Sequence, residues 1–145
     1  PHPRGRGARP GRHDDHARAQ ALAGPSTTVV RSCPGLAHRI REAAAVVAMG
    51  GYNTVCEILA TSTPALIVPR EKPRLEQAIR ARALSRASAI DTARQEAATP
   101  DLLSQWLAGA VRSRTDRSHV ELGGLAAAAR AATRLLTRTP EGEPA

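Results

Sequence analysis

The sequence has 145 residues and a formal net charge of +8, and its hydrophobic fraction of 41% includes no Phe, one Trp and one Tyr. This length suits one domain that buries roughly 70% of the surface its unfolded chain exposes, with marginal stability because the apolar residues are rich in Ala. The charge does not indicate a nucleic-acid partner, because basic residues are interspersed with acidic ones and an aromatic content of 1% leaves almost nothing for bases to stack on.

The first 25 residues are rich in Pro, Gly, Arg and His and carry scarcely an apolar side chain. Such a segment cannot bury enough surface to offset its ordering entropy, so we predict a disordered basic leader over residues 1–25. Its histidines, His2, His13 and His16, do not predict a metal site, because no folded frame holds them together. A domain is predicted over residues 26–137 and a loose tail over residues 138–145.

Short β-branched runs then alternate with amphipathic segments, which is typical of consecutive βα units. Strands are predicted at Thr27 to Arg31, Ala45 to Met49, Ala65 to Val68 and Ala89 to Asp91. Helices are predicted at Leu36 to Ala43, Thr54 to Thr61, Pro73 to Ala87, from an N-cap at Thr99 through Leu107, and at Leu122 to Leu136, with a polar linker from about Arg112 to His119. The predicted fold class is α/β, a Rossmann-like three-layer arrangement of a parallel sheet with helices on both faces.

The two cysteines, Cys33 and Cys56, fit no metal or redox spacing and are interpreted as small buried hydrophobes. No apolar run approaches the roughly 18 residues that span a bilayer, and the start of the sequence lacks the apolar segment of a signal peptide. We therefore expect a cytoplasmic protein whose membrane contact is at most peripheral, with no metal and no cofactor.

The most informative stretch runs from Val46 to Glu57 as strand, glycine turn and helix. In an open α/β sheet ligands bind at the carboxyl ends of the strands, where a helix N-terminus offers unpaired N–H groups to a phosphate. Gly50 and Gly51 would let the backbone approach a pyrophosphate without an intervening Cβ. Thr54 and Glu57 also fit a capping box, in which both side chains would serve only the helix.

A second element favours ligand binding over a purely structural turn. The strand that ends at Pro69 is followed by a charged loop and by Glu76 and Gln77 early in the next helix. Adjacent acid and amide groups at one end of a sheet are able to bind the hydroxyls of a sugar.

Together these motifs resemble the donor signature shared by UDP-dependent glycosyltransferases and the glycosyltransferase family 28 C-terminal domain, which includes the donor half of the peptidoglycan N-acetylglucosaminyltransferase. The resemblance covers roughly Thr27 to Leu136 and implies the C-terminal half of a GT-B fold. It implies that Asn53, Thr54 and the amides of the glycine turn (Gly50, Gly51) hold the diphosphate of a UDP-sugar. Glu57 would accept hydrogen bonds from the ribose, Glu76 and Gln77 would contact the transferred sugar, and the backbone at Ser32 and Cys33 would meet the uracil.

The sequence departs from the family pattern at a few positions. Met49 and Gly50 stand where many relatives have a histidine or serine, and Pro34 and Gly35 stand where acidic residues are common. Glu71 and Lys72 replace a loop in which histidine is common, so that Lys72 or Arg70 would supply positive charge to the diphosphate, or would be solvated loop charges.

The implied reaction inverts the anomeric carbon as it transfers a hexosyl group to an acceptor hydroxyl, without a covalent intermediate. The base is expected outside this chain, in an N-terminal acceptor domain or a separate partner subunit, and we expect a truncated chain that alone binds the donor and transfers nothing. Three alternatives stay open: a non-catalytic module that docks on another subunit, a basic nucleic-acid-binding protein, and a sugar-nucleotide 2-epimerase.

Overall fold

A parallel sheet of three strands in the order β1-β2-β3 forms the centre of the fold. Its strands are β1 (Val46–Ala48), β2 (Ala65–Ile67) and β3 (Asp91–Thr92). The computed structural model describes residues 12–70, 75–124, 129, 133 and 134. The chain divides into two units, Pro1–Gly35 and Leu36–Ala145, and the sheet belongs to the second.

The register of the sheet decides which side chains share a face. Val46 pairs with Ala65, Ala48 pairs with Ile67, and Leu66 pairs with Asp91. Paired residues of neighbouring strands point to the same side, and successive residues alternate. One face therefore carries Val46, Ala48, Ala65 and Ile67, and the other carries Val47, Leu66 and Asp91.

The first face is covered by the helices α2 (Leu36–Glu42), α3 (Tyr52–Leu59) and α4 (Glu76–Arg86). Val55 and Ile58 of α3, and Ala78 and Ala81 of α4, are buried at the i, i+3 spacing that lines one side of a helix. The main core cluster is aliphatic throughout, consisting of Ile40, Ile58, Ala65, Ile67, Ala81 and Ile90. Helices packed through alanine bring their backbones close to the sheet but bury little area per residue.

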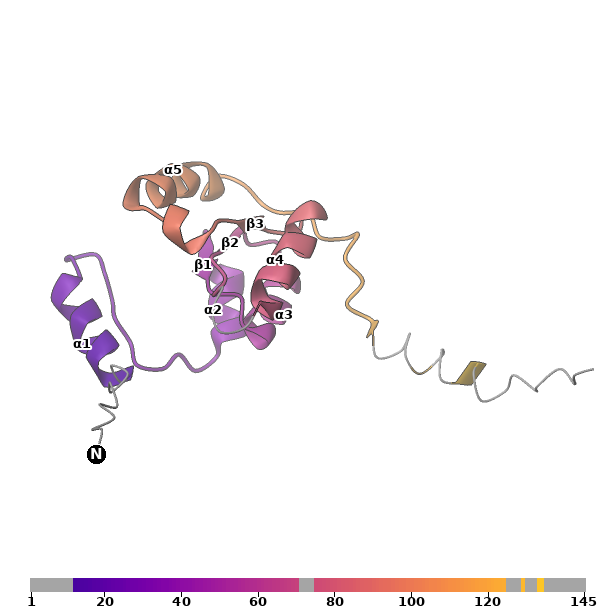
Figure 1. The fold of residues 1–145 in the computed structure, drawn as a ribbon, viewed down its shortest axis with the longest axis horizontal. Helices are drawn as coiled ribbons and strands as arrows, with labels where there is room; N and C mark the ends of the chain where they lie inside the picture. Colours follow the sequence, from indigo (N-terminus) through magenta and orange to yellow (C-terminus); the bar gives the residue numbers. More distant parts are fainter. Residues whose placement is uncertain (1–11, 71–74, 125–128, 130–132, 135–145) are drawn as a thin grey trace, which may run out of the picture. The chain divides into compact units, whose positions relative to one another are not determined.

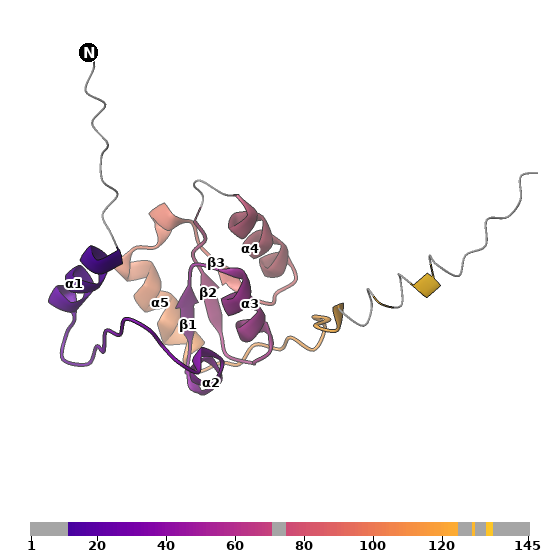
Figure 2. The ribbon, with the colours of Figure 1, turned by 90° about the horizontal axis from the view of Figure 1, so that it is seen from below.

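The second face carries α5 (Pro100–Ala110), which follows the short 3-10 helix η1 (Gln95–Ala97). Trp106 of α5 donates from Nε1 to Oδ2 of Asp91 at 2.8 Å, which ties this helix to β3. Figures 1 and 2 both show α5 on the opposite side of the sheet from α3 and α4. The predicted α/β arrangement with helices on both faces is confirmed.

Several predicted elements are confirmed with shifted ends. The second and third predicted strands correspond to β1 and β2, and Thr99 is the N-cap of α5, since its Oγ1 accepts from the amide of Leu102 at 3.3 Å. The predicted strand Ala89 to Asp91 overlaps β3 only at Asp91. Ala89 and Ile90 are buried residues that precede the strand, and pairing with β2 begins at Asp91.

The predicted strand Thr27 to Arg31 is wrong, because these residues have no strand assignment. They belong to the first unit, Val30 is 59% exposed, and the sheet of the second unit is built from β1, β2 and β3. β-Branched residues favour a strand only where a neighbouring strand supplies hydrogen bonds and side-chain contacts.

The predicted disorder of the leader differs from the structure over α1 (Arg12–Leu22), which is helical. The helix contains three Ala, two Arg, one Gln and one Leu, which have high helix propensity, and its described side chains are nearly all exposed. The prediction from composition did not take this local preference into account. His13 and His16 lie in α1, whereas His2 lies outside the described residues.

The carboxyl-terminal predictions fall partly outside the described residues. Of the helix predicted at Leu122 to Leu136, residues 122–124, 129, 133 and 134 are described. Leu122 and Gly123 are not helical, whereas residues 124, 129, 133 and 134 are, so the helix does not begin at Leu122 as predicted. The tail over residues 138–145, and Pro73 at the predicted start of α4, lie outside the described part of the chain. Within the described part, no helix is both long and apolar enough to cross a membrane.

Candidate functional site

The turn between β1 and α3 has one glycine that the fold requires. Gly50 has a φ of +80°, and a Cβ added there would lie 2.7 Å from Cγ2 of Ile67. Gly51 has an ordinary φ of −57°, and a Cβ added there would meet no atom within 4 Å. Gly50 therefore lets the chain turn tightly over β2, while Gly51 leaves open space beside the start of α3.

The N-terminus of α3 offers free backbone donors. Gly51 is the N-cap residue and provides no side-chain cap, and the first turn closes with the amide of Val55 donating to the carbonyl of Gly51 at 2.9 Å. The amides of Tyr52, Asn53 and Thr54 have no acceptor among the residues that the structure describes. Thr54 lies inside the helix and is not its N-cap, so the capping-box interpretation of Thr54 and Glu57 is wrong.

Glu57 has an unusual environment for a carboxylate. It is half-buried on α3, and its Oε2 is fully buried without a hydrogen-bond partner in the described part of the chain. Buried carboxylate oxygens are normally paired, so a single unpaired one suggests that a ligand supplies the donor. Asn53, one turn earlier on the same helix, is exposed.

A cavity of about 270 Å³ opens at the carboxyl edge of the sheet, lined by Val47, Ala48, Met49, Val68, Arg70 and Gln95. It therefore collects residues from the ends of β1 and β2 and from the segment after β3. Gln77 lies close to it, because its Oε1 accepts from the backbone amide of Arg70 at 3.3 Å. Glu76 is exposed at the first position of α4.

The structure thus brings most of the predicted site residues to one edge of the sheet. Gly50, Gly51, Asn53 and Thr54 lie at the start of α3, and Gln77 lies at the exit of β2. Arg70 lines the cavity there, whereas Glu71 and Lys72 lie outside the described residues. Ser32 and Cys33 belong to the first unit, and their assignment to the uracil stays a prediction. The predicted burial of Cys56 is wrong, because its side chain is exposed.

Sequence reasoning missed Arg80, which joins the two predicted motifs. From α4 its Nη1 donates to the carbonyl of Gly50 at 3.3 Å, and its guanidinium carbon lies 5.4 Å from the centre of the Tyr52 ring. Arg80 follows Gln77 by about one helical turn, so it shares a helix face with the acid-amide pair. That spacing is the one signal in the sequence that pointed toward it.

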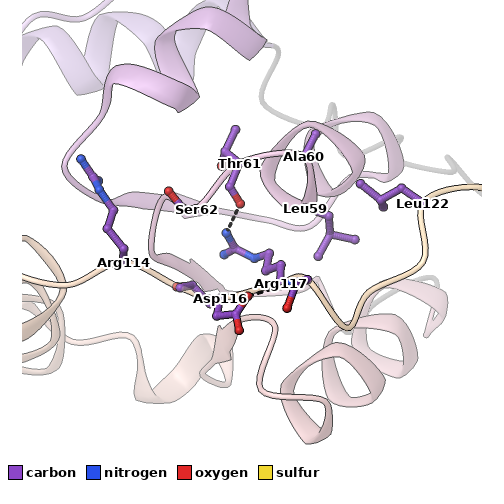
Figure 3. A pocket seen from close by; sticks show the side chains of 10 residues that line it. Leu59, Ala60, Thr61, Ser62, Arg114, Asp116, Arg117 and Leu122 are labelled. Carbon is purple, nitrogen blue, oxygen red and sulfur yellow. Dashed lines mark hydrogen bonds between the residues drawn. The ribbon is translucent and has the colours of Figure 1, made fainter.

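A larger cavity of about 460 Å³ lies at the opposite, amino-terminal edge of the sheet, and its lining includes Thr61, Ser62, Arg114 and Asp116 (Figure 3). Arg117 also lines it and is 7% exposed, donating to the carbonyls of Ala89, Thr61 and Thr63 at 2.6, 2.7 and 3.0 Å. Each of the three guanidinium nitrogens of Arg117 thus donates to a backbone carbonyl, so this side chain serves the fold. This cavity does not share the free donors of the carboxyl edge.

Groups of three or more His, Cys, Asp or Glu side chains that could hold a metal ion are absent from the described residues. The expectation that donor binding needs no metal stays a prediction, as does the absence of a cofactor. The chemistry available at the carboxyl edge consists of backbone amides, a carboxylate and guanidinium groups. Such a set suits an anionic ligand that carries hydroxyl groups.

Comparison with known proteins agrees with this geometry. No curated protein and no solved structure matches the chain. A match to the Glycosyltransferase family 28 C-terminal domain covers residues 10–133, and therefore most of the sequence. The chain belongs to this family and is a donor-binding domain of a glycosyltransferase.

Proposed function

We propose that this chain binds a UDP-sugar at the carboxyl edge of its sheet and, with an N-terminal acceptor domain, transfers the hexosyl group with inversion. The observation that carries the proposal is the first turn of α3, whose free amides at Tyr52, Asn53 and Thr54 lie beside Gly51 in open space. Family membership makes a nucleotide sugar the natural ligand for such a turn.

The diphosphate would lie over the glycine turn. Amides that point at it, together with the positive end of the α3 dipole, would stabilise the charge that develops as the nucleoside diphosphate leaves. Preorganised donors of this kind are usually the largest single contribution to catalysis. The helix dipole alone contributes about 0.3–1 kcal/mol at an exposed terminus, so the amide hydrogen bonds carry most of the effect.

The ribose would contact Glu57. Its buried, unpaired Oε2 would gain a donor when a ribose hydroxyl binds, which removes the penalty of an unsatisfied buried oxygen. Glu76 and Gln77, at the start of α4, would bind hydroxyls of the transferred sugar. The acceptor and the base would come from the partner half, so the chain alone would bind the donor without transfer.

The ribose contact is tested by isothermal titration calorimetry of wild type and Glu57→Ala with UDP and 2′-deoxy-UDP. We expect Glu57→Ala to bind UDP about tenfold or more weakly, because a hydrogen bond to a charged group is lost. The deoxy ligand should bind wild type more weakly than UDP does, but Glu57→Ala should bind both equally.

Glu42→Ala is the matched control, because Glu42 lies on α2 and its carboxylate contacts the exposed side chain of His38 at 3.2 Å. It should bind UDP as wild type does. Equal UDP affinity in wild type and Glu57→Ala would remove the ribose role, and no UDP affinity in wild type would remove the donor site itself.

One observation favours a second candidate, a module that docks on another subunit. Val47, Met49 and Tyr52 are 46%, 57% and 67% exposed, and all flank the glycine turn. An exposed apolar surface of this kind is typical of protein interfaces. If the chain binds another subunit but has no affinity for UDP, this second candidate is favoured. If the chain binds UDP and Glu57→Ala binds it much more weakly, the donor site is favoured.

A further inference from the structure

Arg80 connects the helix that carries the acid-amide pair with the glycine turn. It is half-buried on α4, and its Nη1 reaches across to the carbonyl of Gly50 at 3.3 Å. Thirty residues of sequence separate the two groups. This single side chain therefore places a full positive charge beside the free amides of α3.

Two contacts hold the guanidinium of Arg80 there and leave most of its N–H donors available. An arginine has five N–H donors in a fixed planar fork, and among the described residues the carbonyl of Gly50 is the one acceptor that Arg80 contacts. The bond of 3.3 Å is longer than the usual 2.7–3.2 Å, so it is weak. The Tyr52 ring, 5.4 Å from the guanidinium carbon, holds the cation by its π face.

The electrostatics of the turn explain why a cation is useful at this point. The carbonyl of Gly50 presents a partial negative charge next to the amides of α3, which would oppose a bound diphosphate. Arg80 neutralises that dipole and leaves several N–H donors for phosphate oxygens, to which guanidinium groups bind in a bidentate manner.

Other arginines at this edge are less well positioned. Arg70 lines the cavity of about 270 Å³ but is exposed, and it is its backbone amide, not its guanidinium, that donates to Gln77. Arg82 and Arg94 line a separate cavity of about 170 Å³ with Pro69 and Thr92. Of these four arginines, Arg80 alone is both half-buried and anchored at the glycine turn.

We propose that Arg80 binds the diphosphate of the donor, held ready by the Tyr52 ring and the Gly50 carbonyl. This inference rests on the proposed function, because it takes the glycine turn as the site of the diphosphate. It adds a half-buried charged side chain from α4 to a phosphate site for which the sequence offered backbone amides, small polar residues and the loop charge of Arg70 or Lys72.

The test is calorimetry of the whole chain with UDP and with uridine, which lacks the phosphates. In wild type UDP should bind more tightly than uridine. Arg80→Gln should lower the affinity for UDP by about tenfold or more and leave the affinity for uridine unchanged, because a charge-assisted contact to phosphate is lost. Arg80→Lys should lie between the two, since lysine keeps the charge but not the planar fork.

Arg41→Gln is the matched control, because it removes the same charge from an exposed position on α2, near the amino-terminal end of β1. It should change neither affinity. Thermal melts of each variant separate a folding defect from a binding defect, and Arg80→Lys serves if Arg80→Gln does not fold.

The outcomes separate this inference from the proposed function. If wild type binds UDP and Arg80→Gln binds it equally well, Arg80 does not contact the phosphates, although the donor site stands. If Arg80→Gln lowers the affinities for UDP and for uridine by the same factor, Arg80 only supports the fold. If wild type does not bind UDP, both the donor site and this inference are wrong.

Discussion

At Gly50 two independent features exclude a side chain. The backbone φ is +80°, and an added Cβ would lie 2.7 Å from the Cγ2 atom of Ile67, which is a branched side chain of the central strand with little freedom to move. Neither feature applies to Gly51, whose φ is −57° and whose surroundings are open. Two adjacent glycines of one motif therefore answer to different constraints.

Gly50→Ala should lower the free energy of unfolding by about 2 kcal/mol, because an alanine in the left-handed region is strained and its methyl group would displace Ile67. Gly51→Ala is the control and should lower it by less than about 1 kcal/mol, the effect of a poorer N-cap residue. Urea unfolding of the two variants measures both values. Equal losses would show that the turn does not have the conformation described for Gly50.

At the scale of the elements, Arg117 ties the segment after α5 to the sheet. This segment was expected to be a polar linker, yet Arg117 is 7% exposed and donates to carbonyls that precede β2 and β3. Burial lowers the pKa of its guanidinium, and the nearby charge of Asp91 opposes that shift. An arginine stays protonated in proteins, so the side chain acts as a buried cation shared by carbonyl dipoles.

Arg117→Ala should lower the free energy of unfolding by about 3 kcal/mol or more, because it leaves several buried carbonyls without a donor. Arg114→Ala removes the same charge from an exposed position three residues earlier and should change stability by at most about 0.5 kcal/mol. Urea unfolding of both variants at the same salt concentration makes the comparison. Similar small losses would mean that water replaces the guanidinium at these carbonyls.

Elements with a strong local pattern were predictable from the sequence. The apolar runs of β1 and β2, the Gly-Gly turn and the Thr99 cap each depend on residues that are neighbours in the chain, and the structure contains all of them. Contacts between distant residues were not predictable. The contact between Arg117 and Thr61 spans 56 positions, and the contact between Arg80 and Gly50 spans 30. A local sequence pattern therefore does not predict either contact.

The failure at Thr27 to Arg31 has the same origin. The composition of this segment favours a strand, but a strand forms only where a neighbouring strand supplies hydrogen bonds. These residues lie in a different unit from the sheet. Similarly, the exposure of Glu76 and the unpaired oxygen of Glu57 depend on how α3 and α4 pack. The motifs therefore indicated the edge of the sheet where Gly50, Asn53 and Gln77 lie, but not Arg80, and not the burial or the partners of these residues.

At the scale of the whole molecule, hydrophobic burial stabilises the fold weakly and the repulsion between positive charges opposes it. The main core cluster is made of isoleucine and alanine alone, which limits the hydrophobic stabilisation. The formal net charge of +8 adds self-repulsion in the folded state, where the charges are closer together than in the unfolded chain. When the stabilising term is small, the repulsive term becomes measurable.

Raising NaCl from about 10 mM to about 150 mM shortens the screening length from about 30 Å to about 8 Å, and should therefore raise the urea midpoint of unfolding. The same change should weaken UDP binding, because it also screens the proposed attraction between Arg80 and the diphosphate. Chloride is preferred to sulfate, since sulfate strengthens apolar burial by its own mechanism. A midpoint that falls with added NaCl would mean that attractive ion pairs, and not net repulsion, dominate the electrostatics of the folded chain.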